Sequence, residues 1–371
     1  MICKESNAIL ALIQISFTRQ VRSLPECLDW GKIVDLATEQ GVVGVCYDAI
    51  ELLPSAQRPD LENLMELAGL VSIIEAAYKD NLRITTELSQ FYLNNGIKMM
   101  ILKGYGLSLR WPIPEHRPVG DIDVYFFKIN NSNGNGDKER KDDTEFREKL
   151  PLYVVADKMV EESLGIEIDR EHHHHTCFKY KGVTIENHYD FINVFAHRDA
   201  PMIEAKLKEL AVKSVKKNTI AIEGVESLVY LPSADFNALF LIRHLGQHFA
   251  GERITLRQLL DWHLFLKNEN YNINWIDINQ FLKTVGLYEF KECVNRICVY
   301  CFEDSSINLS PLEKRILNDV LSPEFSDKGT GYWFMFKRWK ANIWKHRLVY
   351  NENLITMFFT LAFSHLRKPI L

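Results

Sequence analysis

The stretch KGYGLSLRWPIPEHRPVGDIDVYF, residues Lys103–Phe126, places two aspartates next to each other in one short apolar segment. Because alternate residues of a strand point to the same face of a sheet, we expect the carboxylates of Asp121 and Asp123 side by side. Like charges this close raise each other's pKa, and a cation between them relieves that cost. Mg²⁺ prefers oxygen ligands of this kind, together with substrate phosphates. The aspartate pair taken alone is more typical of two solvated residues at an exposed strand end than of a magnesium site.

Two neighbouring features favour the metal site over the solvated strand end. The apolar residues around the two aspartates predict a buried strand over residues 122–127. The turn KGYG, residues 103–106, contains glycines that let a backbone approach a phosphate closely. The chain has no Walker A sequence, so we exclude a P-loop.

The stretch resembles the active-site region of the DNA polymerase β-like nucleotidyltransferase superfamily, and more narrowly a bacterial branch of largely uncharacterised nucleotidyltransferases. The residues that carry the resemblance are Leu102, Lys103, Gly104, Arg117, Gly120, Asp121, Ile122, Asp123 and Val124. The wider superfamily usually has Gly-Ser or Gly-Gly in the turn, where this chain has Gly104-Tyr105, and the interval to the aspartates is longer here. The Lys-Gly form of the turn is typical of the narrower branch.

The resemblance implies a metal-dependent enzyme that transfers an NMP group from an NTP to an acceptor hydroxyl and releases pyrophosphate. Asp121 and Asp123 would hold two Mg²⁺ ions. Lys103 would neutralise phosphate charge beside the turn, and a solvated lysine at a strand end is the alternative. The nucleotide-binding residues implied in this stretch are Lys103, Gly104, Tyr105, Gly106 and Arg117.

Two β-prone runs around the turn Lys181-Gly182 predict a β-hairpin. In the second run, VTIENHYDF, we expect Glu186, His188 and Asp190 on one face. A two-metal site commonly takes a third carboxylate from a neighbouring strand, and that group also serves as the base. The resemblance points to the same place, since the family carries an acidic residue, more often Asp, and a histidine two places on. We predict Glu186 as metal ligand and base and His188 as a nucleotide-binding residue, with a polar outer hairpin face as the alternative.

Four consecutive histidines, His172–His175, precede Cys177 in the first run of the same hairpin. Because alternate residues of a strand face opposite sides, we expect that only His172 and His174, or His173 and His175, can act together. Three interpretations stay open. They are a zinc site with Cys177 as a further ligand, a histidine that lines a phosphate pocket, and a polar hairpin face.

The helical segment LRQLLDWHLFL, residues 256–266, contains a further candidate. Arg257 and Asp261 stand four residues apart, on one face of the expected helix. The resemblance extends to this segment, where the family carries an Arg and an Asp. Arg257 either contacts the triphosphate of a bound nucleotide or pairs with Asp261.

The distribution of apolar residues predicts an α+β fold. Helical spacing dominates before residue 95 and after residue 231, and the expected strands lie between these positions. We therefore expect an N-terminal helical region, 1–95, a nucleotidyltransferase-like core with a small mixed β-sheet, 96–230, and a C-terminal helical region, 231–371. A highly charged segment, residues 128–149, is expected to be a loop within the core.

Charge and cysteine usage limit the classes of function. The net charge of −5 and the pI near 6.2 disfavour general nucleic-acid binding, which needs a basic surface. The seven cysteines are odd in number and scattered, as in proteins of a reducing compartment. We find neither a signal peptide nor an apolar run of the roughly 18 residues that a membrane span needs. The sequence therefore predicts a cytoplasmic protein.

The acceptor stays unidentified, and two alternatives to the enzyme are open. A small molecule or a sugar, a protein side chain and an RNA end are all open as acceptors. The acidic pI disfavours RNA, and a small molecule or a sugar is the favoured class. The longer interval before the aspartates motivates the first alternative, an inactive relative that only binds nucleotide. The second is an interaction protein that uses residues 331–350, where basic and aromatic residues would suit a polyanion or an anionic membrane surface. A helix that packs its aromatic residues within the C-terminal region explains the same pattern.

Overall fold

The computed structural model describes residues 3–20, 23–128, 150–213, 216–222, 225–322 and 332–352. The chain divides into two compact units, and each is assembled from segments that are distant in sequence. The first unit comprises Met1–Tyr78, Leu107–Pro118 and Asn237–Leu354, and the second comprises Lys79–Gly106, Val119–Phe236 and Ile355–Leu371. The division of the chain at residues 95 and 231 stays a prediction.

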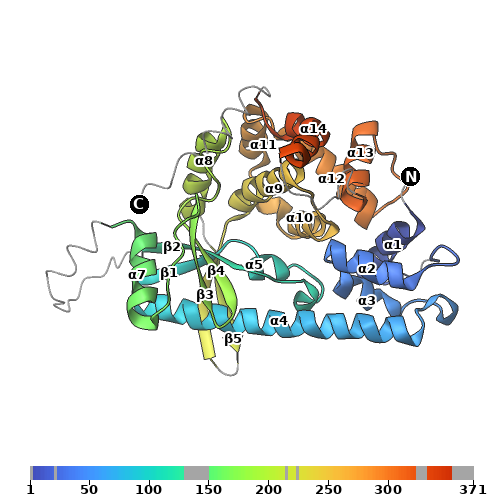
Figure 1. The fold of residues 1–371 in the computed structure, drawn as a ribbon, viewed down its shortest axis with the longest axis horizontal. Helices are drawn as coiled ribbons and strands as arrows, with labels where there is room; N and C mark the ends of the chain where they lie inside the picture. Colours follow the sequence, from blue (N-terminus) through green and yellow to red (C-terminus); the bar gives the residue numbers. More distant parts are fainter. Residues whose placement is uncertain are drawn as a thin grey trace. The chain divides into compact units, whose positions relative to one another are not determined.

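The described part of the first unit is helical (Figure 1). Its helices are α1 (Lys4–Thr18), α2 (Trp30–Gln40), α3 (Val43–Ile50), the first part of α4 (Leu61–Asn94), nearly all of α9 (Ala234–Gly251), α10 (Leu256–Glu269), α11 (Trp275–Thr284), α12 (Tyr288–Phe302), α13 (Pro311–Leu321) and α14 (Tyr332–Val349), with the short 3₁₀ turns η1 (Ser55–Gln57), η2 (Pro114–His116) and η3 (Asn270–Asn272). Local sequence signals fix several helix starts. Capping boxes open α10 at Thr255 and α13 at Ser310, because each hydroxyl and the Gln or Glu three residues later satisfy backbone N–H groups.

The second unit is built on a six-stranded mixed sheet with the strand order β3-β4-β2-β1-β6-β5. The strands are β1 (Ile97–Ile101), β2 (Ile122–Lys128), β3 (His175–Tyr180), β4 (Val183–His188), β5 (Lys216–Ile222) and β6 (Val225–Leu231). Strand β1 pairs antiparallel with β2 and parallel with β6, and β2 pairs parallel with β4. The expected α+β fold, with a small mixed sheet and helical flanks, is confirmed.

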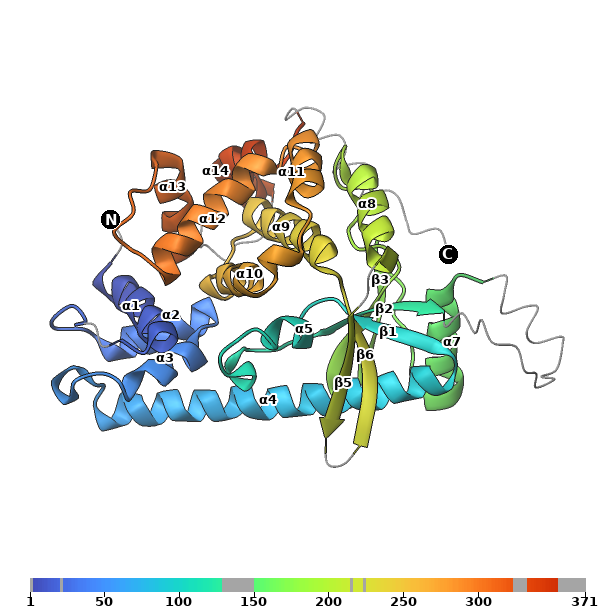
Figure 2. The same cartoon turned by 180° about the vertical axis from the view of Figure 1, so that it is seen from behind.

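Helices α4 and α7 (Leu152–Leu164) cover one face of this sheet (Figure 1 and Figure 2). The apolar side chains on that face include Ile84, Leu88 and Tyr92 of α4, Val155, Ala156 and Val160 of α7, and Ile122, Val124, Phe126, Phe178 and Ile185 of the strands. Because side chains alternate along a strand, Asp123 of β2 and Glu186 of β4 point to the opposite face. The packed core therefore determines the face on which the carboxylates lie.

A buried polar network lies on the same face as the apolar core, between α7 and the hairpin. Asn187 of β4 is completely buried, and its Nδ2 donates to Asp157 Oδ1 over 2.7 Å. The Thr176 hydroxyl donates to the same oxygen over 2.9 Å. The other carboxylate oxygen, Asp157 Oδ2, is buried and has no hydrogen-bond partner among the described residues. Burial outweighs the hydrogen bonds and raises the pKa of Asp157 to about 6.

Several local expectations can be compared with the structure. The predicted hairpin is confirmed, but β3 begins only at His175, so residues 172–174 are bends rather than strand and the rule that only alternate histidines act together is wrong there. Helix α8 (Ala200–Lys213) was not predicted. Most of the charged segment, residues 129–149, lies outside the described residues.

Two expectations concern membranes. Among the described helices, none is both long enough and apolar enough to span a bilayer. In the stretch 331–350, α14 is a helix, but the side chains of several of its first residues lie outside the described part of the chain. Packing of this stretch within the C-terminal region therefore stays the prediction, and peripheral membrane contact stays its untested alternative.

We predict that Asp157→Asn stabilises the protein at neutral pH and leaves its stability unchanged near pH 4. The folded pKa of about 6 exceeds the usual 3.8, so the folded state binds the proton more tightly and stability falls as pH rises between these values. Asparagine cannot ionise, so the variant escapes a cost of about 3 kcal/mol at pH 7. Thermal unfolding at both pH values measures the effect.

The matched control is Asp80→Asn, since Asp80 is an exposed residue of α4. We expect this variant to follow the wild-type protein at both pH values. Equal melting temperatures for Asp157→Asn and wild type at pH 7 would contradict the inference that the buried, ionised Asp157 carboxylate lowers stability.

Candidate active site

The predicted site residues meet where β2 and β4 run side by side. In the parallel register, Asp123 lies opposite Glu186 and Tyr125 lies opposite His188. One ligand atom from each of Asp123, Glu186 and His188 lies within 4.8 Å of the others. Carboxylates that are distant in the sequence are thus brought together by backbone pairing alone.

Asp123 is buried and is held by two cationic groups. Lys103 Nζ lies 2.8 Å from Asp123 Oδ1, and His188 Nε2 lies 3.0 Å from the same oxygen. Burial by itself raises the pKa of Asp123, but the charge of Lys103 and the hydrogen bond and charge of His188 outweigh it and hold that pKa far below its usual range. Asp123 is therefore an anion at neutral pH.

His188 is buried and lies between the two facing carboxylates. Its Nε2 lies 3.4 Å from Glu186 Oε2, in addition to its contact with Asp123, and its Nδ1 lies 3.2 Å from the backbone carbonyl of Asp190. Burial disfavours the imidazolium, but the hydrogen bonds to Asp123 and Glu186 outweigh it and raise the pKa of His188. Both ring nitrogens can then donate.

Asp121 lies directly before β2 and is the exposed member of the group. Partial burial raises its pKa most, and the negative charges of Glu186 and Asp123 raise it further, against the opposing effect of Lys103 and a hydrogen bond with Thr184. The repulsion shows that three carboxylates share one neighbourhood. A set of carboxylate oxygens with uncompensated repulsion fits Mg²⁺, a hard ion that prefers oxygen ligands.

The glycine turn follows β1 and runs beside the aspartates. Gly104 has φ +56°, a conformation that glycine adopts without strain, and a Cβ there would lie 3.9 Å from the backbone oxygen of Asp121. Gly106 leaves room for Leu231, whose side chain would lie 3.1 Å from an added Cβ. Tyr105 packs against the core of the second unit. The turn thus brings Lys103 and its backbone next to the carboxylates.

Arg117 and Arg257 belong to the first unit. Arg117 donates through Nε and Nη2 to the two oxygens of Asp261, each over 2.8 Å, and Trp111 Nε1 donates to the same carboxylate over 2.9 Å. Arg257 Nη1 donates to the carbonyl of Pro118 over 3.3 Å. Of the two interpretations of Arg257, the structure does not favour the ion pair, because Arg117 forms the bidentate pair with Asp261.

Two of the four consecutive histidines line the carboxylate cluster. His175 lies opposite His188 in the hairpin register, and its Nε2 lies 3.9 Å from Glu186 Oε1. The His174 ring lies 5.5 Å from the His188 ring. Burial is the main cause that lowers the pKa of His174 to about 3 and of His175 to about 4, so both rings are neutral at pH 7. In the sequence, the run of four histidines was the signal that pointed to His174 and His175.

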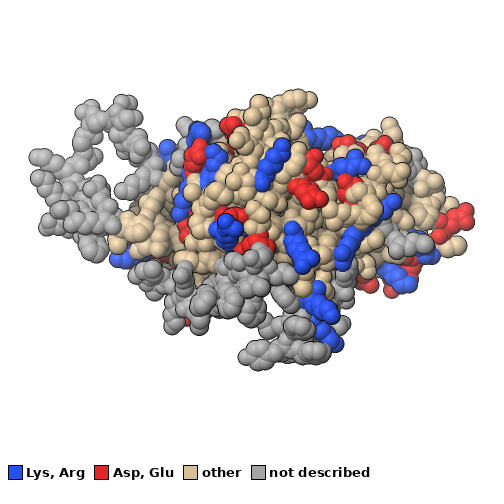
Figure 3. Space-filling model, turned by 90° about the horizontal axis from the view of Figure 1, so that it is seen from above, with Lys and Arg blue, Asp and Glu red and all other residues tan. Residues whose placement is uncertain are grey.

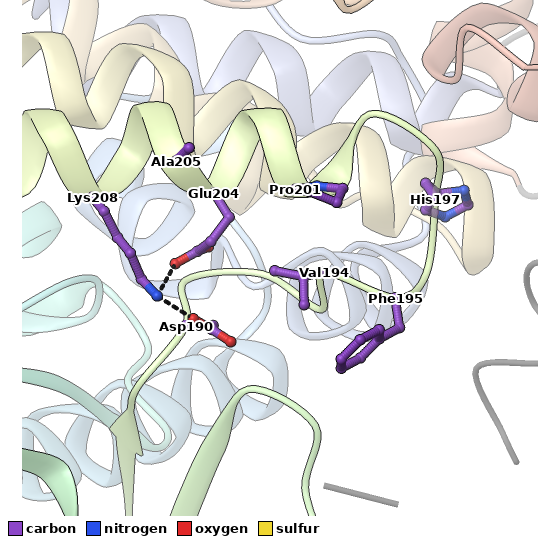
Figure 4. A pocket seen from close by; sticks show the side chains of 8 residues that line it. All are labelled: Asp190, Val194, Phe195, His197, Pro201, Glu204, Ala205 and Lys208. Atoms are coloured by element: carbon purple, nitrogen blue, oxygen red, sulfur yellow. Dashed lines mark hydrogen bonds and ion pairs between the residues drawn. The ribbon is translucent and has the colours of Figure 1, made fainter. Parts of the chain in front are cut away.

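A pocket of about 580 Å³ opens beside the end of β4 (Figure 4). It is lined by Asp190, Val194, Phe195, His197, Pro201, Glu204, Ala205 and Lys208. Lys208 pairs with the carboxylates of both Asp190 and Glu204, as Figure 4 shows. Burial raises the pKa of Glu204 to about 7, although the backbone N–H groups of Phe191 and Ile192 donate to it. Sequence analysis missed Glu204 and Lys208, because neither belongs to a motif.

The surface charge agrees with the modest net charge. On the face shown in Figure 3, Lys and Arg side chains and Asp and Glu side chains are interspersed, so no patch of a single sign covers the described part of that face.

Comparisons with known proteins cover the part of the chain that contains the candidate site. A family model described as "Uncharacterised nucleotidyltransferase" matches residues 26–128 and 155–303, more than half of the chain, and both the aspartate strand and the hairpin lie inside the match. No curated protein matches the sequence. Among solved structures, the chain is similar to an antigenic nucleotidyltransferase-like protein from Paracoccidioides brasiliensis, with 13% identity over 50% of this chain and 73% of that chain. The TM-score is 0.31, so we base no argument on this likeness.

We predict that Lys103→Met lowers the free energy of unfolding by about 3 kcal/mol at pH 7, because it leaves the buried Asp123 carboxylate with one cation fewer. A depressed carboxylate pKa contributes stability above the unfolded value of 3.8 and loses it as pH falls. The difference between variant and wild type should therefore shrink below about pH 4. Denaturant unfolding at pH 7 and pH 3.5 measures both effects.

Lys98→Met is the matched control, since Lys98 lies in β1, the strand that precedes Lys103. The Lys98 ammonium lies over the rings of Phe127 and Tyr230, an interaction worth about 0.5–1 kcal/mol. Equal losses of unfolding free energy for Lys103→Met and Lys98→Met would show that Lys103 does not stabilise the buried Asp123 carboxylate.

Proposed function

Because the chain belongs to the uncharacterised nucleotidyltransferase family, we propose that it transfers an NMP group from an NTP to an acceptor hydroxyl in a Mg²⁺-dependent reaction. The observation that carries the proposal is the register that places Asp123 opposite Glu186, with Asp121 close enough for mutual repulsion. The proposal includes a relationship with the bacterial branch of the DNA polymerase β-like superfamily and a cytoplasmic location.

Asp121, Asp123 and Glu186 are the residues that would hold two Mg²⁺ ions. Bound there, the ions would neutralise charge on the triphosphate and on the oxygen that leaves with pyrophosphate. Glu186 is also the proposed base, because its carboxylate lies at the edge of the cluster next to His175 and is partly exposed. It would take the proton of the acceptor hydroxyl.

Lys103, His188 and the glycine turn are proposed to bind the phosphates. Lys103 and His188 are cations that share one oxygen of Asp123, so each can turn to a phosphate oxygen when a metal ion takes over that carboxylate. The turn Gly104–Gly106 runs beside Asp121, and Gly104 lets the backbone approach a phosphate closely there. Arg257 and Arg117 stay in the proposal as nucleotide-binding residues, with Arg117 constrained by its bidentate pair with Asp261.

A small molecule or a sugar is the proposed acceptor. The pocket beside β4 has a volume of about 580 Å³, which lies within the roughly 300–1,000 Å³ typical of small-molecule sites. Its lining combines the carboxylates of Asp190 and Glu204, the ammonium of Lys208 and the ring of Phe195. This lining suits a ligand with several hydroxyl or amino groups. The pocket is linked to the carboxylate cluster because the Asp190 carbonyl accepts from His188.

A second candidate function is nucleotide binding without catalysis. The observation that favours it is the pairing of Asp123 with both Lys103 and His188, because a metal-binding carboxylate is then already neutralised. Calorimetric titration with ATP and Mg²⁺, together with a separate pyrophosphate assay, distinguishes the two functions. Binding without pyrophosphate release for any class of acceptor favours this candidate.

We predict that Asp123→Asn and Glu186→Gln each reduce NMP transfer at least about 100-fold, because each removes charge that stabilises the transition state. The protein is incubated with cell extract, Mg²⁺ and each of the four NTPs labelled at the α-phosphate. Labelled acceptor and released pyrophosphate are the two readouts. Asp80→Asn on the exposed surface of α4 is the control, and we expect it to keep wild-type activity. Undiminished transfer by Asp123→Asn would exclude the proposed site.

We predict that Lys208→Met raises the amount of extract that gives half-maximal labelling roughly tenfold, since a charge-assisted hydrogen bond to the acceptor is lost. The KM for the NTP should stay unchanged, because the pocket is proposed for the acceptor alone. Lys206→Met on the same helix is the control; Lys206 pairs with Glu209 and does not line the pocket. If Lys208→Met and Lys206→Met show the same dependence on extract, the pocket does not bind the acceptor.

A further inference from the structure

Three side chains of different chemistry converge next to the hairpin, outside the carboxylate cluster. Asp169 Oδ2 and His172 Nε2 are 3.3 Å apart, His172 Nε2 and Cys177 Sγ are 3.5 Å apart, and Asp169 Oδ2 and Cys177 Sγ are 3.9 Å apart. The group combines an oxygen, a nitrogen and a sulfur ligand. No residue of this group is part of the proposed nucleotidyltransferase site.

The backbone holds two of the three residues in place. Asp169 and Cys177 form an isolated antiparallel bridge, in which each N–H donates to the other's carbonyl over 2.8 and 2.9 Å. The N–H of Glu171 donates to Asp169 Oδ1, which leaves Oδ2 turned toward the other two ligands. The Tyr189 hydroxyl donates to the carbonyl of His172 over 2.8 Å and fixes the third residue. The side chains therefore meet on a prearranged backbone.

We propose that Asp169, His172 and Cys177 bind one Zn²⁺ ion. Typical bond lengths of about 2.3 Å to sulfur, about 2.05 Å to histidine nitrogen and about 2.1 Å to a carboxylate oxygen give ligand–ligand distances of about 3.4–3.6 Å in a tetrahedron. The three observed distances deviate from these values by no more than about 0.3 Å. A thiol and an imidazole select zinc over magnesium, since soft and borderline ligands favour transition metals. Three protein ligands leave a fourth position for water.

The ion can enter from solvent, because the side chains of His172 and Asp169 are 41% and 52% exposed. The site also adjoins the proposed base. Cys177 lies opposite Glu186 in the hairpin register, and the His172 ring stacks on the His175 ring at 4.4 Å. A bound ion would hold His172 against His175 and so restrict the side chain next to Glu186.

The test is titration of metal-free, full-length protein with Co²⁺, whose thiolate complexes absorb through sulfur-to-metal charge transfer, followed by displacement with Zn²⁺. We expect one equivalent of thiolate-bound Co²⁺ per chain, displaced by one equivalent of Zn²⁺. Cys177→Ser should abolish the absorption. His172→Gln and Asp169→Asn should weaken Co²⁺ binding at least about 100-fold, more than the loss caused by removing an outer-shell partner.

Two control variants make the result specific. Cys27→Ser changes a free, exposed cysteine elsewhere in the chain and should leave the absorption intact. Asp123→Asn removes a carboxylate of the other cluster and should also leave it intact, so the outcome is independent of the nucleotidyltransferase activity. Circular dichroism confirms that each variant is folded, and Asp169→Asn replaces Cys177→Ser as the decisive variant if the latter is not. Absence of the charge-transfer absorption in the wild-type protein, its persistence in folded Cys177→Ser, or an unchanged Co²⁺ affinity of Asp169→Asn would overturn the proposal.

Discussion

The parallel pairing of β2 with β4 is the constraint on which the candidate site depends. It sets Asp123 opposite Glu186, and it is itself fixed from the other face of the sheet. There, Ile185 lies in the apolar core and Asn187 is tied to Asp157 of α7. A slip of β4 by one residue would turn Glu186 and His188 into that core and expose the apolar set, so the packing of α7 maintains the geometry of the carboxylates.

The charges on the site face form a second, interdependent system. Burying Asp123 without a cation would be costly, and the structure supplies Lys103 and a His188 whose pKa is raised by the same carboxylate. Asp121 is exposed, and partial burial together with the charges of Glu186 and Asp123 raises its pKa instead. The carboxylates are thus neutralised unevenly, and the repulsion that remains is concentrated around Asp121, at the exposed end of the cluster. A cation from solvent would meet Asp121 and Glu186 first, where the electrostatic gain is largest.

The sequence predicted what depends on local spacing. The two-residue interval placed Asp121 and Asp123 on one face, and the same alternation identified Glu186 and His188 in the hairpin. Features that depend on contacts between distant segments were not predictable in this way. Asp261 accepts from Arg117, 144 residues away, whereas helical spacing pointed to Arg257. Burial in the packed α8 raises the pKa of Glu204, although the backbone N–H groups of Phe191 and Ile192 that donate to it lower that pKa.

The consecutive histidines show how one shifted strand end changes the chemistry available. A strand through residues 172–175 would alternate the rings, but the bends before His175 place His172 with Cys177 and His174 with His188. Two sets of potential metal ligands then lie close to each other. Asp123, Glu186 and His188 form the set rich in carboxylates, and Asp169, His172 and Cys177 form the set with a thiol. His175 lies between them and is neutral, since burial lowers its pKa to about 4, so it adds no charge to either set. Ligand chemistry rather than distance would keep magnesium in the first set and zinc in the second.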